Sequence, residues 1–120
     1  MNRLCVISIY VSDMEVAKEF YCEKLGFEIS EEYDAVTVGL KHDGITIVLC
    51  KTERTTAASY PDTAQVVLGL ETENLLSKMK QLTDKGVAMI YDEPQPCPPG
   101  YYNAFLDPFG NAIELLEFNQ

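Results

Sequence analysis

Residues 107–117 read DPFGNAIELLE. The first five residues, with proline, glycine and asparagine together, have the composition of a tight turn. The remainder is an apolar run interrupted by one carboxylate, Glu114, as expected for a final strand. Successive side chains of a strand point to opposite faces. We therefore expect Glu114 to share one face with Ala112 and Leu116, and the intervening isoleucine and leucine to pack against a helix.

The N-terminal half begins with a comparable pattern. Residues 4–11 are rich in branched and aromatic side chains, which favours a strand. Ser12 or Asp13 then caps a helix that runs to about Leu25, and Gly26 ends it. Three further strands are expected at residues 28–33, 35–40 and 45–51, with an Asp43-Gly44 hairpin turn between the last two.

The second half repeats this order of elements. The pattern predicts a strand at 65–70, a helix at 73–85, further strands at 87–91, 102–106 and 112–118, and a proline-rich loop at 94–100. A shift of 60 residues places Gly26 on Gly86, each at the end of a helix. The sequence therefore predicts an α+β fold of two tandem βαβββ modules in a single domain. The expected bounds are 1–120 for the domain, about 1–52 for module 1, 53–63 for a connecting loop and about 64–120 for module 2.

Three short motifs accompany residues 107–117: YVSDME at 10–15, FY at 20–21 and LGF at 25–27. Together they resemble the signature of the vicinal oxygen chelate superfamily, which includes glyoxalase I, extradiol dioxygenases, and the fosfomycin- and bleomycin-resistance proteins. The resemblance extends over essentially the whole chain. It implies that the two modules form a curved mixed sheet around a groove, with the helices on the outer face, and that the protein is a homodimer.

The composition argues against several kinds of partner. The chain has 19 acidic and 9 basic residues and a formal net charge of −10 at pH 7. Nucleic acids and anionic membranes bind surfaces of positive potential, so neither is an expected partner, whereas a cationic ligand is compatible with this charge. The four cysteines form no CxxC pair, and no apolar run resembles a secretion signal or a membrane span. We therefore expect a cytoplasmic protein with reduced thiols.

The resemblance also implies where a catalytic metal would bind. Metal-dependent members hold one divalent ion with His or Glu side chains from the first and last strands of each module. The corresponding positions in this chain are Val6, Val48, Gln65 or Val66, and Glu114. Valine cannot bind a cation and Gln65 is at best a weak ligand, which leaves Glu114 as the one usual ligand. The lone histidine, His42, falls in the expected hairpin turn. We therefore expect no metal and no other cofactor.

Strand alternation indicates which side chains line the groove instead. On this basis the expected ligand-binding residues are Val6, Ser8 and Tyr10 in the first strand, Thr46, Val48 and Cys50 in the fourth, and Glu114 and Leu116 in the last. The resemblance adds Gln65, at a metal-ligand position of the family, and Tyr102, because the proline-rich loop borders the groove in the family architecture and Tyr101 or Tyr102 is expected to stack there on a flat ligand. Such a wall suits a small organic ligand that has an apolar or aromatic body and a cationic or hydrogen-bonding head. The alternative is that these side chains fill a collapsed groove and that Glu114 reaches solvent at its mouth.

Three functional hypotheses follow. The first is a metal-free small-molecule-binding protein of the bleomycin-resistance type, which sequesters its ligand and is not an enzyme. The second is a glyoxalase-like lyase or isomerase, or a dioxygenase-related enzyme, that binds a divalent metal through a rearranged site with Glu114 as ligand and base. The third is a metal-free enzyme with Glu114 as general base. The sequence does not identify the ligand or the substrate.

Overall fold

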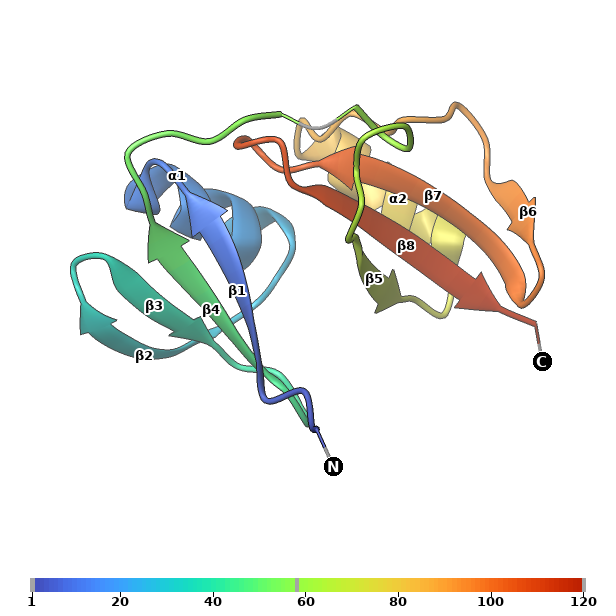
Figure 1. Cartoon of the computed structure of the whole chain (residues 1–120). Helices are drawn as coiled ribbons and strands as arrows, with labels where there is room; N and C mark the ends of the chain where they lie inside the picture. Colours follow the sequence, from blue (N-terminus) through green and yellow to red (C-terminus); the bar gives the residue numbers. More distant parts are fainter. Residues whose placement is uncertain (1, 58, 120) are drawn as a thin grey trace. The chain divides into compact units, whose positions relative to one another are not determined.

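The computed structural model describes residues 2–57 and 59–119, and the chain divides into two compact units, Met1–Thr56 and Ala57–Gln120 (Figure 1). The first contains β1 (Val6–Val11), α1 (Met14–Lys18), η1 (Glu19–Lys24), β2 (Ile29–Asp34), β3 (Thr37–Leu40) and β4 (Thr46–Lys51). The second contains β5 (Leu68–Glu71), α2 (Leu75–Asp84), β6 (Gln95–Cys97), β7 (Gly100–Leu106) and β8 (Ala112–Phe118). The strand orders are β1-β4-β3-β2 and β5-β8-β7-β6. This shared order confirms an α+β fold of two βαβββ modules, whereas their union in a single domain stays a prediction.

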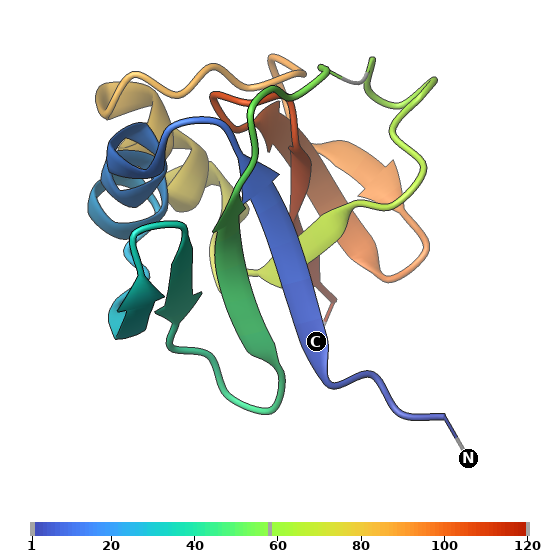
Figure 2. The same cartoon turned by 60° about the vertical axis from the view of Figure 1, so that its left-hand side comes forward.

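The first unit is built on the parallel pair β1 and β4, which run side by side (Figure 2). Ile9 lies opposite Leu49, and Val11 lies opposite Lys51. Alternate residues of the two strands are buried, including Ile9, Ile47 and Leu49, and α1 packs on β4. The alternation of buried and more exposed side chains is the pattern of a sheet with one face covered by a helix.

The helix of the first unit changes its winding before it ends. Asp13 caps its start, since Oδ1 accepts a hydrogen bond from the backbone N–H of Val16 at 3.1 Å. The chain then continues as the π-helical turn η1, after which the N–H of Leu25 donates to the carbonyl of Phe20, five residues back, at 3.0 Å. Gly26 follows with φ +88° and ends the helix as predicted. The expected single α-helix is therefore half α and half π.

In the second unit, α2 is fixed to the sheet at its first turn. The side chain of Asn74 accepts a hydrogen bond from the N–H of Ser77 at 3.0 Å. Oε1 of Glu117, in β8, accepts another from the N–H of Leu75 at 2.7 Å. Leu75, Met79 and Leu82 are buried on the side of α2 that packs on β7 and β8. No helix within residues 2–57 and 59–119 is long and apolar enough to cross a membrane.

Two predictions for the second module are wrong. The predicted strand at 87–91 is absent, because Tyr91 pairs with the side chain of Asn103 where a strand would continue a backbone ladder. Its place at the edge of the sheet is taken by β6, within the segment predicted to be a loop. An edge position tolerates Pro96, which has no N–H to donate. In addition β5 begins at Leu68, so that Gln65 lies in the preceding loop and is exposed.

The turn between β7 and β8 is organised by one buried carboxylate. Oδ1 of Asp107 accepts hydrogen bonds from the N–H groups of Phe109 and Asn111 at 2.9 and 2.8 Å. Oδ2 accepts a third, at 2.8 Å, from the side-chain amide of Asn111. Gly110 has φ +91°, and a Cβ there would lie 2.4 Å from the Cα of Ala57. Glycine is therefore required for both the conformation and the close approach.

We expect Asp107→Ala to lower the free energy of unfolding by about 2–4 kcal/mol, because several buried hydrogen bonds to a carboxylate are lost together. Asp92→Ala, which removes an exposed carboxylate from the same unit, should change it by no more than about 0.5 kcal/mol. Urea unfolding at neutral pH followed by circular dichroism measures both. Equal effects of the two substitutions would contradict this role of Asp107.

Candidate functional site

Glu114 lies at the centre of β8, on the face of the second sheet opposite α2. Its neighbours in register are Gly69 of β5 and Ala104 of β7, two of the smallest residues. Ile113 and Leu115, on either side of it in sequence, are fully buried on the α2 side. Glu114 itself is half-buried. The small neighbours leave space above the sheet for other side chains to reach its carboxylate.

Tyr60 occupies that space. Its hydroxyl donates a hydrogen bond to Oε2 of Glu114. Burial, followed by the hydrogen bond and the negative charge of Glu114, raises the pKa of Tyr60 well above its ordinary value. The phenol is therefore protonated at neutral pH and acts as a donor to the carboxylate.

Two more tyrosines extend the group, and we call Tyr60, Tyr91 and Tyr102 the tyrosine cluster. The rings of Tyr60 and Tyr91 meet edge to face with centroids 6.4 Å apart, and those of Tyr91 and Tyr102 with centroids 6.0 Å apart. A hydrogen bond with Tyr91, together with burial, raises the pKa of Tyr102. The cluster and Glu114 thus combine three aromatic rings, several hydroxyl groups and one carboxylate on one face of the sheet.

Tyr91 is held in place from the core of the unit. Asn103 is fully buried, and its Oδ1 accepts a hydrogen bond from the N–H of Tyr91 at 3.1 Å. Its Nδ2 donates to the carbonyl of Tyr91 at 2.9 Å. One amide therefore satisfies both backbone groups of a residue that belongs to no strand.

We expect Asn103→Leu to lower the free energy of unfolding by about 2–3 kcal/mol, because both backbone groups of Tyr91 lose their partner at nearly constant side-chain volume. It should also weaken the near-ultraviolet circular dichroism of the tyrosines. Asn119→Leu makes the same change of side chain at an exposed position and serves as the control; it should alter neither the stability nor the tyrosine signal in this way. An unchanged tyrosine signal in folded Asn103→Leu would show that Asn103 does not position Tyr91.

Sequence reasoning found Glu114 and Tyr102 but missed Tyr60 and Tyr91 as members of one cluster. Tyr60 falls in the polar segment interpreted as a connecting loop, 54 positions before Glu114. Tyr91 was placed at the end of a strand that does not form. No periodic pattern relates these residues to β8. A single tyrosine in each of two loops does not by itself indicate that the two side chains lie together.

The other predicted ligand-binding residues are distributed over both units. In the first unit, the register pairs Val6 with Thr46, Ser8 with Val48 and Tyr10 with Cys50, so that these six residues share one face of the sheet. Leu116 lies beside Tyr102 on the face of the second sheet that carries Glu114. Gln65 lies outside β5 and is not part of that face. The participation of all these residues in binding stays a prediction.

The donor set does not fit a metal site of the type that the resemblance implies. Val6 and Val48 have no donor atom, and the carboxylate of Glu114 accepts a hydrogen bond from Tyr60. Across the described parts of the chain, no three His, Cys, Asp or Glu side chains come together. His42 is exposed.

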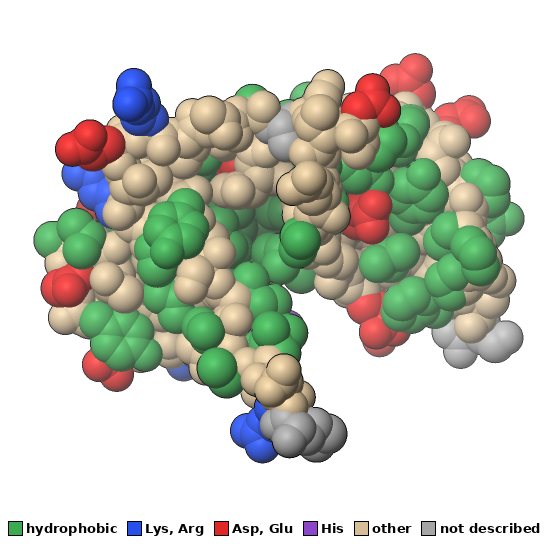
Figure 3. Space-filling model, viewed as in Figure 1, with side chains coloured by type: hydrophobic (Ala, Val, Ile, Leu, Met, Phe, Trp, Pro, Cys, Tyr) green, Lys and Arg blue, Asp and Glu red, His purple; other side chains and the backbone are tan. Residues whose placement is uncertain are grey.

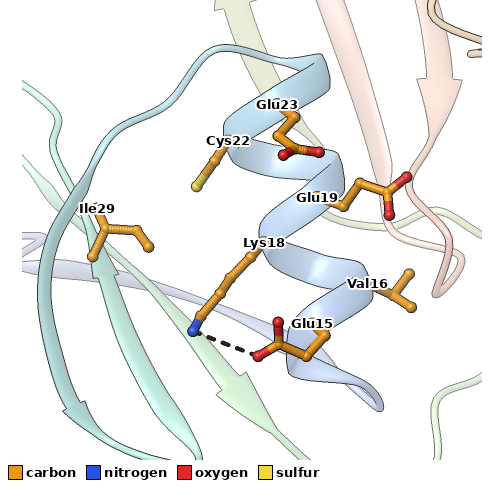
Figure 4. A pocket seen from close by; sticks show the side chains of 7 residues that line it. All are labelled: Glu15, Val16, Lys18, Glu19, Cys22, Glu23 and Ile29. Atoms are coloured by element: carbon orange, nitrogen blue, oxygen red, sulfur yellow. Dashed lines mark ion pairs between the residues drawn. The ribbon is translucent and has the colours of Figure 1, made fainter.

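A separate hollow of ≈380 Å³ lies beside α1 and η1 in the first unit (Figure 4). It contains the amine of Lys18 and the thiol of Cys22. Lys18 forms ion pairs with Glu15, at 3.7 Å, and with Glu32. Burial raises the pKa of Cys22, and the nearby charge of Lys18 opposes this in part. The thiol is therefore not activated as a nucleophile.

The basic residues of the second unit are confined to α2 and its C-terminal end, whereas its acidic residues are spread along the unit. Residues 57–120 include nine acidic and three basic residues, a formal charge of −6. Two of the three lysines, Lys78 and Lys80, are on α2, and Lys85 follows its last turn. In Figure 3, acidic side chains lie among hydrophobic ones over the surface of this unit. The strands that carry Glu114 and Tyr102 contain no basic residue.

The ionisation of Tyr60 provides a test of the hydrogen bond to Glu114. An ordinary tyrosine ionises near pH 10. Above about pH 10 the unfolded chain loses the proton that folded Tyr60 keeps, so the free energy of unfolding falls as the pH rises. We expect a shallower fall in Tyr60→Phe, measured by urea unfolding at a series of alkaline pH values, with the exposed Tyr33→Phe as control. Identical slopes for the wild type and Tyr60→Phe would contradict the interaction.

Comparison with known proteins supplies the family. The sequence model of the Glyoxalase/Bleomycin resistance protein/Dioxygenase superfamily matches residues 3–115. No curated protein matches the sequence. Among solved structures, TnmS3, an antibiotic-binding protein from Streptomyces sp. CB03234, is 27% identical with a TM-score of 0.74, over 99% of this chain and 98% of that one.

Two further solved structures show how far the likeness extends. A glyoxalase/bleomycin resistance protein from the same Streptomyces strain is 28% identical with a TM-score of 0.67, over 96% of this chain and 100% of that one. A lactoylglutathione lyase from Agrobacterium tumefaciens has a TM-score of 0.73 over 98% of this chain and 94% of that one, but is 17% identical. The last similarity concerns the fold alone.

Proposed function

Because the chain belongs to the glyoxalase/bleomycin resistance protein/dioxygenase superfamily, we propose that it is a metal-free small-molecule-binding protein that acts by sequestration. Its site includes the face of the second sheet around Glu114 and the tyrosine cluster. We further propose that it is a cytoplasmic homodimer. The four cysteines are all free, in keeping with a reducing compartment.

The observation that carries this proposal is the hydrogen bond from Tyr60 to Glu114. Glu114 stands where metal-dependent members of the family place a metal-binding carboxylate. In this chain that carboxylate accepts a hydrogen bond from the hydroxyl of Tyr60. The raised pKa of Tyr60 keeps the phenol protonated, so the phenol is not an additional anionic ligand for a cation. Hydrogen bonding and aromatic contact are the means of recognition that this group of side chains offers.

The likeness to an antibiotic-binding protein supports a binding function over catalysis. At 27% identity it supports the class of function and does not identify the ligand. The lyase alternative requires a second and a third metal ligand near Glu114, and the described residues do not supply them. No observation on the second unit favours that alternative.

The metal-free part of the proposal is tested by elemental mass spectrometry of untagged protein purified without chelators. We expect nickel, zinc, manganese and iron well below one atom per chain, and no uptake after soaking with these ions. Stoichiometric metal that is lost in Glu114→Ala would contradict the proposal and would direct attention to lyase and dioxygenase assays.

The binding part is tested with a library of drug-sized aromatic compounds, by thermal shift followed by two-dimensional NMR of ¹⁵N-labelled protein. We expect ligands that raise the melting temperature and shift the signals of Tyr102, Ala104 and Glu114. Tyr102→Ala should weaken binding, whereas Tyr101→Ala should not, because Tyr101 is the adjacent tyrosine of β7 and lies on the other face of the sheet. Ligands that bind Tyr102→Ala as well as the wild type would contradict the assigned site.

A further inference from the structure

Resting on that proposed function, we propose that the site selects organic cations that bear N–H groups. The ligand would be an aromatic amine or guanidine whose charged head bonds the carboxylate of Glu114 and whose ring lies against the tyrosine cluster. This assignment names the chemical class of the ligand, which the family does not determine.

The carboxylate has the geometry for this role. A carboxylate can accept about four hydrogen bonds, and Tyr60 supplies one of them, at Oε2. Glu114 is half-buried, so a charge placed beside it is less screened by water than on an open surface. An ammonium or guanidinium group satisfies the remaining acceptor positions with charge-assisted hydrogen bonds, which are stronger than those from a neutral hydroxyl.

The aromatic rings of the tyrosine cluster also favour a positively charged head group on the ligand. Tyrosine rings attract a cation through the negative potential of their faces, and the attraction grows where water is excluded. Tyr91 contacts both other rings edge to face, which holds the three together near one carboxylate. An aromatic ligand body can add to such an edge-to-face arrangement without disturbing the hydrogen bond between Tyr60 and Glu114.

The charge distribution of the unit disfavours anionic ligands. The strands of the second sheet contain three glutamates, Glu71, Glu114 and Glu117, and no lysine or arginine. The three lysines of the unit lie on α2 or directly after it, and α2 packs on the opposite face of the sheet. A phosphate or carboxylate ligand would meet Glu114 with no compensating basic group from these strands, so anions are disfavoured.

The test uses a matched pair of probes, 2-naphthylmethylamine and 2-naphthalenemethanol, which share the ring system and differ in the charged head. Dissociation constants come from NMR titrations of the ¹⁵N-labelled full chain at pH 7. We expect the amine to bind wild type about tenfold more tightly or better, the ratio that one charged hydrogen bond supplies. Glu114→Gln should reduce the amine to the affinity of the alcohol and leave the alcohol unchanged.

Two controls accompany this substitution. The glutamine amide oxygen can still accept from Tyr60, so Glu114→Gln removes the charge with little change in shape, and its NMR spectrum reports whether the fold is kept. Glu73→Gln changes the net charge equally at an exposed position before α2, and it should leave both affinities as in the wild type. Tyr102→Ala should weaken both probes.

The outcomes separate this inference from the proposed function. Equal affinities for amine and alcohol in the wild type, unchanged in Glu114→Gln, would overturn cation selection and leave small-molecule binding at this face intact. Signal shifts that map away from Tyr102, Ala104 and Glu114 for both probes, or the absence of shifts with either probe, would overturn both.

Discussion

The three hydrogen bonds that Asp107 accepts within its turn set the register of β7 against β8. That register places Ala104 beside Glu114 and Tyr102 beside Leu116. A slip of one residue would send Glu114 to the α2 side, where Ile113 and Leu115 are fully buried, and would expose those two side chains. The position of the carboxylate thus depends on the five-residue turn 107–111, in which the backbone of Ala57 leaves no room for a side chain at Gly110.

The core and the candidate site are joined through Asn103. A buried amide is costly unless its donors and acceptors are satisfied, and here both backbone groups of Tyr91 satisfy it. The same bonds fix Tyr91 beside β7, although the segment 87–91 forms no strand and Ile90 donates one backbone hydrogen bond to that strand, to the carbonyl of Ala104 at 2.8 Å. One polar side chain on the helix-facing side therefore positions an aromatic ring of the tyrosine cluster, and the two faces of the sheet do not vary independently.

Much of the fold could be predicted from local signals. The alternation along β8, the glycines at 26 and 86, and the repeated order of elements are readable because each depends on neighbours in the sequence. The edge strand β6 was missed because its prolines indicate a loop, and the sheet edge that tolerates Pro96 is a tertiary feature. For the candidate site, Glu114 follows from strand parity, and Tyr102 from the place that the family resemblance gives its loop beside the groove. Tyr60 does not, since its bond to Glu114 joins positions 54 apart and leaves no periodic trace.

The hydroxyl of Tyr60 competes with any ligand for one oxygen atom of Glu114. A ligand that binds Oε2 has to displace this hydroxyl, which belongs to the same chain and is therefore present at a fixed, high effective concentration. A ligand that leaves this bond in place is confined to the acceptor positions of Glu114 that Tyr60 does not use. The bond therefore restricts which positions of the carboxylate a cationic head can take without the free-energy cost of displacing the phenol.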